Sequence, residues 1–356
     1  MHFTKTIFMT GFPGFIAERL VDKLASPTTQ FFLLVQPQFL DTAMASVERI
    51  CERTGTPLEN FALIKGDITL PQMGVADDDY SILQSETTDV FHLAAVYDLG
   101  VNEETAVRVN LEGTRRVNEF VRSIWGLHRY NYVSTCYVAG KRKGVIRETE
   151  LEHDAGFRNY YEETKYLAEK ETAALKGDVP LTIFRPSVVV GDSHSGQTAK
   201  YDGIYYLIRY LRKAPSILRL INVGNSDVRL NLVPVDFVID AIAALSTDEE
   251  AVGKTIALAD PRPLTTAELF DLIAKGLSGK PSYAHPPSKL VNMALNMPLS
   301  PKLTGMPYAA VPYFFLSQTY DTSTADELLE PHNIICPNFR AYVQHLLDFV
   351  EKHPKL

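Results

Sequence analysis

The chain has 356 residues and a formal net charge of -8 at pH 7; 46% of the residues are hydrophobic and 22% are charged. These values are typical of a globular protein long enough for about two domains. The acidic balance argues against a broad nucleic-acid surface, which needs clustered basic residues. The three cysteines have no metal-ligand spacing and fit a reducing cytoplasm better than a disulfide framework, so we expect a cytoplasmic protein without a structural metal.

No targeting or membrane-spanning segment is predicted. The first fifteen residues lack the charged region, apolar run and small-residue cleavage site of a secretory signal. The most apolar later stretches, 291–300 and 307–317, are interrupted by Pro, Asn or Ser before the roughly 20 residues that a spanning helix requires. Peripheral contact with a membrane stays open.

The first half of the chain alternates short apolar runs with helical patterns. Apolar strands separated by helices are typical of a parallel sheet with helices on both faces, so we predict an α/β protein with a Rossmann-type doubly wound sheet. The predicted strands are 6–11, 31–36, 61–68, 90–96, 130–135 and 181–191. The predicted helices begin near residue 15 and cover 42–55, 106–124 and 160–170.

The second half of the chain departs from this alternation. The pattern breaks after residue 191 and returns at 229–260, and the segment that follows is rich in Pro and aromatic residues. We therefore predict a dinucleotide-binding domain of residues 1–190, to which 229–260 return. A smaller, interleaved C-terminal substrate lobe is predicted from residues 191–228 and 261–356.

The first predicted strand leads into a glycine-rich turn. Gly11, Gly14 and Ala17 form a G-x-x-G-x-x-A pattern that opens a helix. Gly11 permits the tight turn, Gly14 lets the backbone approach a pyrophosphate, and Ala17 allows close packing of helix on strand. The free N–H groups of the helix N-terminus would face the anion. A plain glycine turn is the alternative, and the position in the first strand-turn-helix unit favours dinucleotide binding.

The end of the second strand indicates which nicotinamide cofactor binds. An Asp or Glu there would bond the ribose 2'-hydroxyl and repel a 2'-phosphate, whereas this sequence has Gln36 and Gln38. The absent acid favours NADP(H) over NAD(H), although no arginine stands nearby to hold the phosphate.

Residues 157–170 contain the pattern Tyr-x-x-x-Lys twice. Tyr161 and Lys165 lie at i and i+4 near the predicted helix start, so they share one helix face. Tyr166 and Lys170 lie more than a turn further along, where a packed tyrosine and a solvated lysine are expected. Tyr160 points about 100° around the helix from Tyr161 and is expected to line a wall.

Seven short motifs follow one another along the chain: TGFPGFIA at 10–17, GDI at 66–68, HLAA at 92–95, VNLEGT at 109–114, VSTCYVAG at 133–140, YYEETK at 160–165 and FRPSVVVG at 184–191. In their order and rough spacing the chain resembles the extended short-chain dehydrogenase/reductases over about residues 5–260. Residues 184–193 and 233–242 look most like the thioester-reductase and fatty acyl-CoA reductase branch, also called the male-sterility type.

The resemblance implies that Thr135, Tyr161 and Lys165 are catalytic. Hydride arriving at a carbonyl carbon leaves charge on the oxygen, so the hydroxyls of Thr135 and Tyr161 should stabilise it, and one must deliver a proton. A free tyrosine has a pKa near about 10, and we expect the Lys165 ammonium to lower the pKa of Tyr161. The resemblance adds that Lys165 holds the nicotinamide ribose.

The same resemblance implies the rest of the cofactor site. Asp67 and Ile68 should lie at the adenine, Ala94 and Ala95 along the cofactor backbone, and Pro186 with Val188 near the carboxamide. The full set of predicted cofactor-binding residues is Gly11, Phe12, Pro13, Gly14, Phe15, Ile16, Gln36, Asp67, Ile68, Ala94, Ala95, Asn110, Tyr161, Lys165, Pro186 and Val188.

Three further polar residues are assigned to structure. Asn110 matches a helix position that orders the site in relatives, with a simple internal cap as the alternative. His92 is expected to be structural inside a strand, and Asp236 to be a helix N-cap.

The aromatic and aliphatic segments 201–220 and 307–320 suit an apolar substrate chain, with ordinary lobe packing as the alternative. The first hypothesis is an NAD(P)H-dependent reductase of an acyl thioester, linked to coenzyme A or a carrier protein, or of an aldehyde. Arg209, Arg212 and Lys213 share a helix face that could meet the phosphates of such a carrier, although a solvated basic face is favoured. The resemblance also implies a possible homodimer.

Other functions stay open. A nucleotide-sugar epimerase or a hydroxysteroid-like dehydrogenase of the same superfamily would use the same residues. Dehydratase chemistry is disfavoured, because those relatives follow the catalytic threonine with an Asp-Glu pair, whereas Cys136 and Tyr137 follow Thr135. A non-catalytic dinucleotide-binding regulator is disfavoured by the intact set of Thr135, Tyr161 and Lys165.

Overall fold

A seven-stranded parallel sheet forms the centre of the computed structural model, which describes residues 3–213, 221–297 and 307–355. The strand order is β10-β7-β5-β4-β1-β2-β3, and every pair is parallel. This order reverses direction between β1 and β4, the arrangement of a dinucleotide-binding fold. The strands are β1 Lys5–Thr10, β2 Thr29–Val35, β3 Phe61–Lys65, β4 Asp89–His92, β5 Arg129–Val133, β7 Leu181–Pro186 and β10 Thr255–Leu258.

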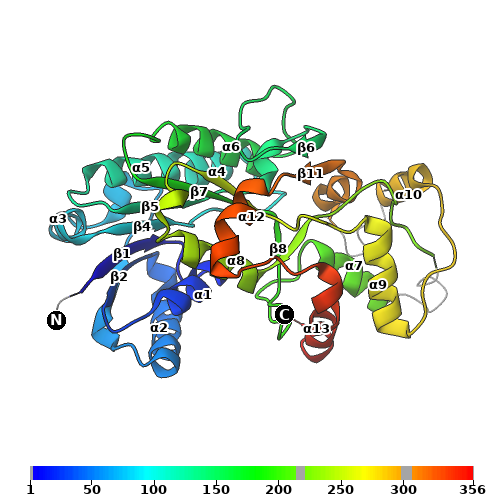
Figure 1. Cartoon of the computed structure of the whole chain (residues 1–356), viewed down its shortest axis with the longest axis horizontal. Helices are drawn as coiled ribbons and strands as arrows, with labels where there is room; N and C mark the ends of the chain where they lie inside the picture. Colours follow the sequence, from blue (N-terminus) through cyan, green and yellow to red (C-terminus); the bar gives the residue numbers. More distant parts are fainter. Residues whose placement is uncertain (1–2, 214–220, 298–306, 356) are drawn as a thin grey trace.

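Helices cover both faces of this sheet (Figure 1). Strand side chains alternate between two apolar clusters: Ile7 and Met9 of β1 belong to one, and Phe8 to the other. The first face is covered by α1 Phe15–Leu24, α2 Leu40–Thr54, α8 Val235–Leu245 and α12 Ser323–Leu329. The second is covered by α3 Asp77–Glu86, α5 Gly113–Ser123 and α6 Tyr160–Ala173, with α4 Glu103–Ala106 and a π-helical turn, Val107–Glu112, leading into α5.

The C-terminal half adds a third apolar cluster beside the sheet, on the right of Figure 1. Two short parallel strand pairs connect it to the rest of the chain: β8 Val188–Val190 with β9 Leu232–Pro234, and β6 Gly144–Ile146 with β11 Gln318–Tyr320. Its helices are α7 Ile204–Lys213, α9 Thr266–Ser278, α10 Ser288–Leu295, α13 Phe339–Lys352 and the 3-10 segment Tyr308–Phe315.

The predicted doubly wound parallel sheet is confirmed, and residues 229–260 contain β9, α8 and β10. The division into a dinucleotide-binding domain and a substrate lobe stays a prediction. The assignment of Asp236 as a helix N-cap is wrong, because α8 begins at Val235 and Pro234 is its N-cap. The Asp236 carboxylate instead accepts hydrogen bonds from the Ser193 backbone N–H at 2.7 Å and the Ser193 hydroxyl at 2.6 Å.

Candidate active site

Thr135, Tyr161 and Lys165 meet at the carboxyl edge of the sheet. Thr135 follows the end of β5, and the other two residues lie on α6. All three side chains are buried, and the Thr135 side chain lies near enough to Tyr161 to lower the pKa of its phenol. The Thr135 hydroxyl also accepts from the Tyr137 backbone N–H at 3.2 Å. The structure therefore brings together the three residues that the sequence singled out.

The start of α6 fixes where Tyr161 lies. Asn159 is the N-cap, and its side-chain oxygen accepts from the Glu162 backbone N–H at 3.0 Å. Tyr160, which we expected to line a wall, is exposed. The second pair behaves as expected: Tyr166 is buried, and Lys170 pairs with Glu152 at the surface.

Lys165 is held by the neighbouring strand. Its ammonium donates to the Tyr132 hydroxyl at 3.1 Å and to the Val133 carbonyl oxygen at 3.0 Å. Burial lowers the pKa of Lys165 to about 8, while the Glu169 carboxylate acts in the opposite direction. Lys165 is therefore mostly an ammonium at pH 7 and loses its proton as pH rises through about 8.

The expectation that Tyr161 has a lowered pKa is wrong. Burial raises the pKa of Tyr161, and the Thr135 side chain lowers it only in part. The physical reason is that Lys165 directs its ammonium at the β5 backbone and Tyr132. Tyr161 thus keeps its proton at neutral pH and is a hydrogen-bond donor.

His92 and Asn110 form buried hydrogen bonds next to the site. His92 is buried inside β4, as expected, and its ring nitrogens lie 2.7 Å from the Thr10 hydroxyl and 3.0 Å from the Thr114 hydroxyl. Burial, with the nearby Lys165 charge, lowers the pKa of His92 to about 3, so the ring is neutral. Asn110 accepts from the Val96 backbone N–H at 2.8 Å and donates to the Thr164 hydroxyl at 3.1 Å, joining the loop after β4 to α6.

The glycine turn fits a dinucleotide. Gly11 has a φ of +92°, and a Cβ there would lie 2.9 Å from the Ala94 backbone nitrogen. A Cβ on Gly14 would lie 2.6 Å from the Gly11 carbonyl oxygen. Gly14 is also the N-cap of α1 and supplies no side-chain cap, which leaves the first-turn N–H groups for an anion. Phe12, Pro13, Phe15 and Ile16 complete this turn and the start of the helix.

Gln36 and Asp67 are hydrogen-bonded to each other at the ends of β2 and β3. The Gln36 side-chain nitrogen donates to the Asp67 carboxylate at 2.7 Å. Ile68 is buried against Gly113, where a Cβ would lie 2.6 Å from the Ile68 Cδ1. The remaining predicted residues follow other strand ends: Ala94 and Ala95 come after β4, Pro186 ends β7 and Val188 begins β8.

Tyr97 and Tyr137 are site neighbours that sequence reasoning did not assign. The Tyr97 ring meets the Tyr161 ring edge-on at a centroid distance of 5.2 Å. Their positions in the sequence could have identified them, because both residues follow strands that end at the carboxyl edge of the sheet. Tyr137 also borders a small cavity between the sheet and the C-terminal segments. That cavity is lined by Tyr137, Ser187, Val188, Arg229, Leu230, Asn231, Tyr313, Leu316, Gln318 and Tyr320.

Neither a metal-binding cluster nor a membrane-spanning helix occurs among the described residues. No group of three or more His, Cys, Asp or Glu side chains that could hold a metal ion occurs within 3–213, 221–297 and 307–355. Across the same ranges, none of the helices combines the length and apolar character needed to cross a bilayer.

The strand order, the glycine turn and the arrangement of Thr135, Tyr161 and Lys165 define an extended short-chain dehydrogenase/reductase fold. The family described as male sterility protein matches residues 9–242, so the chain belongs to that family. The predicted branch of the superfamily is thus confirmed.

Three known proteins illustrate the similarity. The fatty acyl-CoA reductase wat of Drosophila melanogaster is 24% identical over 283 residues, which cover 68% of this chain and 54% of that protein. The terminal R domain from the myxalamid PKS-NRPS pathway has a TM-score of 0.83 at 22% identity, covering 100% of this chain and 92% of the domain. The UDP-glucuronic acid 4-epimerase of Bacillus cereus has a TM-score of 0.67 at 20% identity, covering 98% of each chain.

The identities and coverages limit what these comparisons show. The chain spans about half the length of the curated reductases that it matches. The two structural likenesses support the fold alone.

Proposed function

We propose that this protein is an NAD(P)H-dependent reductase that transfers hydride to the carbonyl carbon of an acyl thioester. The observation that carries the proposal is the burial of Thr135, Tyr161 and Lys165 together at the carboxyl edge of the sheet, with the tyrosine and the lysine one helical turn apart on α6. The matches to fatty acyl-CoA reductases support the substrate class.

Thr135, Tyr161 and Lys165 would have different roles in the reaction at the carbonyl group. When bound, the reduced dinucleotide supplies the hydride. The Thr135 and Tyr161 hydroxyls would donate hydrogen bonds to the carbonyl oxygen, on which charge develops. Tyr161 then gives its proton to that oxygen, and Thr135 with the Lys165 ammonium stabilises the phenolate that remains. Cleavage of the C–S bond releases a thiol and leaves an aldehyde.

The dinucleotide would be held by the loops at the carboxyl edge of the sheet. The N–H groups at the start of α1 would bind the pyrophosphate, Asp67 and Ile68 the adenine, and Lys165 the nicotinamide ribose. Gln36 carries no charge that would repel a 2'-phosphate, and it engages the nearby Asp67 carboxylate. The uncharged Gln36 at the end of β2 favours NADP(H) over NAD(H), whereas the Asp67 carboxylate acts in the opposite direction.

The acyl group would lie against the C-terminal segments. The apolar cluster there includes Tyr137 and Tyr161 together with Tyr205 and Ile208 of α7, so an apolar chain could continue from the reacting carbon into this lobe. Coenzyme A or a carrier protein would present the thioester. Arg209 is partly exposed on α7 and could meet its phosphates, whereas the Arg212 guanidinium donates to the Val350 carbonyl oxygen.

Two features of the protein's setting stay predictions. A homodimer is expected through the helix that carries the tyrosine, which is α6 in the structure. A cytoplasmic location is supported by three cysteines that are all unpaired.

An assay of reduced-nicotinamide absorbance tests the proposal. NADPH and NADH are supplied with a panel of acyl-CoAs and medium- to long-chain aldehydes, with Tyr161→Phe as the catalytic control. The expected result is thioester turnover that collapses in Tyr161→Phe and prefers NADPH. Tight cofactor binding without net turnover contradicts the proposal and favours the second candidate, a nucleotide-sugar epimerase, which regenerates its own NAD.

A further inference from the structure

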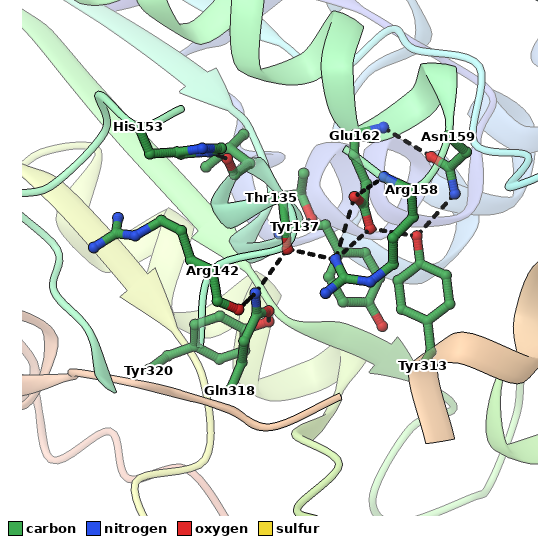
Figure 2. A network of polar contacts seen from close by, with 12 residues as sticks. Thr135, Tyr137, Arg142, His153, Arg158, Asn159, Glu162, Tyr313, Gln318 and Tyr320 are labelled. Atoms are coloured by element: carbon green, nitrogen blue, oxygen red, sulfur yellow. Dashed lines mark hydrogen bonds and ion pairs between the residues drawn. The ribbon is translucent and has the colours of Figure 1, made fainter. Parts of the chain in front are cut away.

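Tyr313 connects the C-terminal half of the chain to the first turn of α6. Its hydroxyl donates to the Glu162 carboxylate at 2.5 Å and accepts from the Asn159 side-chain nitrogen at 2.8 Å (Figure 2). Asn159 caps α6 and Glu162 follows Tyr161 directly. Tyr313, about 150 positions further along the chain, is therefore hydrogen-bonded to residues before and after Tyr161, the proposed proton donor.

Glu162 makes this contact a strong one. The side chain of Glu162 is completely buried and pairs with the Arg158 guanidinium at 3.1 Å. The Arg158 backbone N–H also donates to the Glu162 carboxylate, at 2.9 Å. A buried carboxylate is costly unless its oxygens are bonded, and hydrogen bonds to an ionised acceptor are stronger than neutral ones. The Tyr313 hydroxyl is thus one of the groups that stabilise the charge at the start of α6.

The same tyrosine also contacts the loop that carries Thr135. The Tyr313 and Tyr137 rings pack at a centroid distance of 4.6 Å, and the Tyr137 backbone N–H donates to the Thr135 hydroxyl. Tyr313 and Tyr137 line the small cavity together with Val188. One side chain from the C-terminal half therefore lies against the segments that supply both hydroxyls of the site.

A second contact from the C-terminal half acts on the same loop. The Gly140 carbonyl oxygen accepts from the Gln318 side-chain nitrogen at 2.7 Å and from the Arg158 guanidinium. Gln318 also donates to the Arg142 carbonyl oxygen at 2.7 Å. The loop after β5 and the start of α6 are thus joined to each other and to the segment 313–318.

We infer that Tyr313 is a positioning residue for hydride transfer: it fixes the Tyr161 hydroxyl relative to the Thr135 hydroxyl through Glu162, Asn159 and Tyr137. The inference rests on the proposed function. It assigns a role in the reaction to a residue outside the family match at 9–242. Because a misplacement of about 1 Å can lower a rate about 100-fold, loss of one remote hydroxyl should be visible in kcat.

The test compares three conservative variants of the full chain. Tyr313→Phe keeps the ring on Tyr137 and removes only the hydroxyl. Asn159→Ser keeps an N-cap oxygen and removes the amide donor to Tyr313. Tyr342→Phe is the matched control, since Tyr342 is also buried in the C-terminal half but donates to the Leu232 carbonyl oxygen at 3.3 Å, away from α6.

The expected result is a fall in kcat of roughly 10- to 100-fold for Tyr313→Phe and a smaller fall for Asn159→Ser. The dissociation constant for NADPH should stay close to that of Tyr342→Phe, which keeps the wild-type kcat, while the melting temperature of Tyr313→Phe falls because the buried Glu162 carboxylate loses one hydrogen-bond donor. A purely structural role would move the melting temperature and leave the kcat of the folded protein unchanged.

The outcomes separate the two proposals. If the wild type reduces thioesters and Tyr313→Phe matches its kcat, the inference is overturned and the proposed function stands. If Tyr313→Phe only lowers the melting temperature below that of Tyr342→Phe, Tyr313 is structural and the inference is again overturned. If the wild type shows no net reduction of any carbonyl substrate, the proposed function fails and the inference fails with it.

Discussion

Lys165 is hydrogen-bonded to Tyr132, with 3.1 Å between the ammonium nitrogen and the phenol oxygen, although the sequence pairs it with Tyr161. Tyr132 lies on β5, three residues before Thr135, and its ring also lies under the ammonium at 4.7 Å from the centroid. The lysine is therefore anchored by the strand that leads to the threonine. The hydrogen bonds of the ammonium go to Tyr132 and to the Val133 carbonyl oxygen, so the charge is held at β5.

Removal of the Tyr132 hydroxyl should shift the pH dependence of the reaction. Tyr132→Phe keeps the ring under the ammonium and removes one acceptor, so the pKa of Lys165 should fall below its present value of about 8. In the wild type, kcat/KM should decrease as pH rises through about 8, because Lys165 loses its proton there. Tyr132→Phe should move this decrease to lower pH. Identical pH profiles for the two proteins would contradict the role of Tyr132.

His92 should make the protein less stable in acid. Its pKa is about 3 in the folded protein and near 6.5 in an unfolded chain, so the unfolded state binds the additional proton between these values. The stabilisation is complete above pH 6.5 and is lost as pH falls toward 3, with a total of at most about 5 kcal/mol. Denaturant unfolding at several pH values should show a shallower pH dependence for His92→Gln. An unchanged slope between pH 6.5 and 4 would show that another group is responsible.

Two glutamates on α6 should differ sharply in their contribution to stability. Glu169 is 1% exposed and pairs with the buried Arg185, whereas the Glu171 side chain is 35% exposed and pairs with Arg115. Glu169→Gln leaves Arg185 buried without its counter-charge and should cost about 3–5 kcal/mol. Glu171→Gln is the matched control and should cost at most about 1 kcal/mol. Equal losses in urea unfolding would rule out burial as the deciding factor.

A methyl group at Gly14 should weaken dinucleotide binding. Gly14→Ala places a Cβ against the Gly11 carbonyl oxygen in the turn proposed to bind the pyrophosphate. The dissociation constant for NADPH, from fluorescence titration, should rise roughly tenfold or more, which is about 1.4 kcal/mol. Gly126→Ala is the control, because a Cβ there meets nothing within 4 Å. Unaltered affinity in Gly14→Ala would remove this turn from the cofactor site.

The sheet and the three residues at its edge could be predicted because their signals are local. Apolar runs alternate with helical patterns, and the spacing of Tyr161 and Lys165 alone places them on one helix face. The position of Thr135 at a strand end then brings it to the same edge as α6.

The remaining features depend on contacts or patterns that sequence reasoning did not use. Helix α3 begins with three aspartates and buries only Leu83, so its apolar periodicity is too weak to indicate a helix. Helix α9 did carry a signal, the Thr265 and Glu268 capping box, within a segment interpreted from its composition alone. The contacts of Tyr132 with Lys165 and of Tyr313 with Glu162 join residues 33 and 151 positions apart, and no local pattern encodes them.

The pairing of β6 with β11 has a consequence for exchanging parts between relatives. β6 belongs to the loop after Thr135, and β11 lies more than 170 residues later, yet the two form one small parallel ladder. Next to it, the Glu148 carboxylate accepts from the backbone N–H groups of Ala257 and Thr324, at 2.7 and 2.6 Å. A chimaera that takes its C-terminal half from another reductase must therefore import residues 144–148 as well. These residues belong to the N-terminal half in sequence but pair with the C-terminal half in the structure.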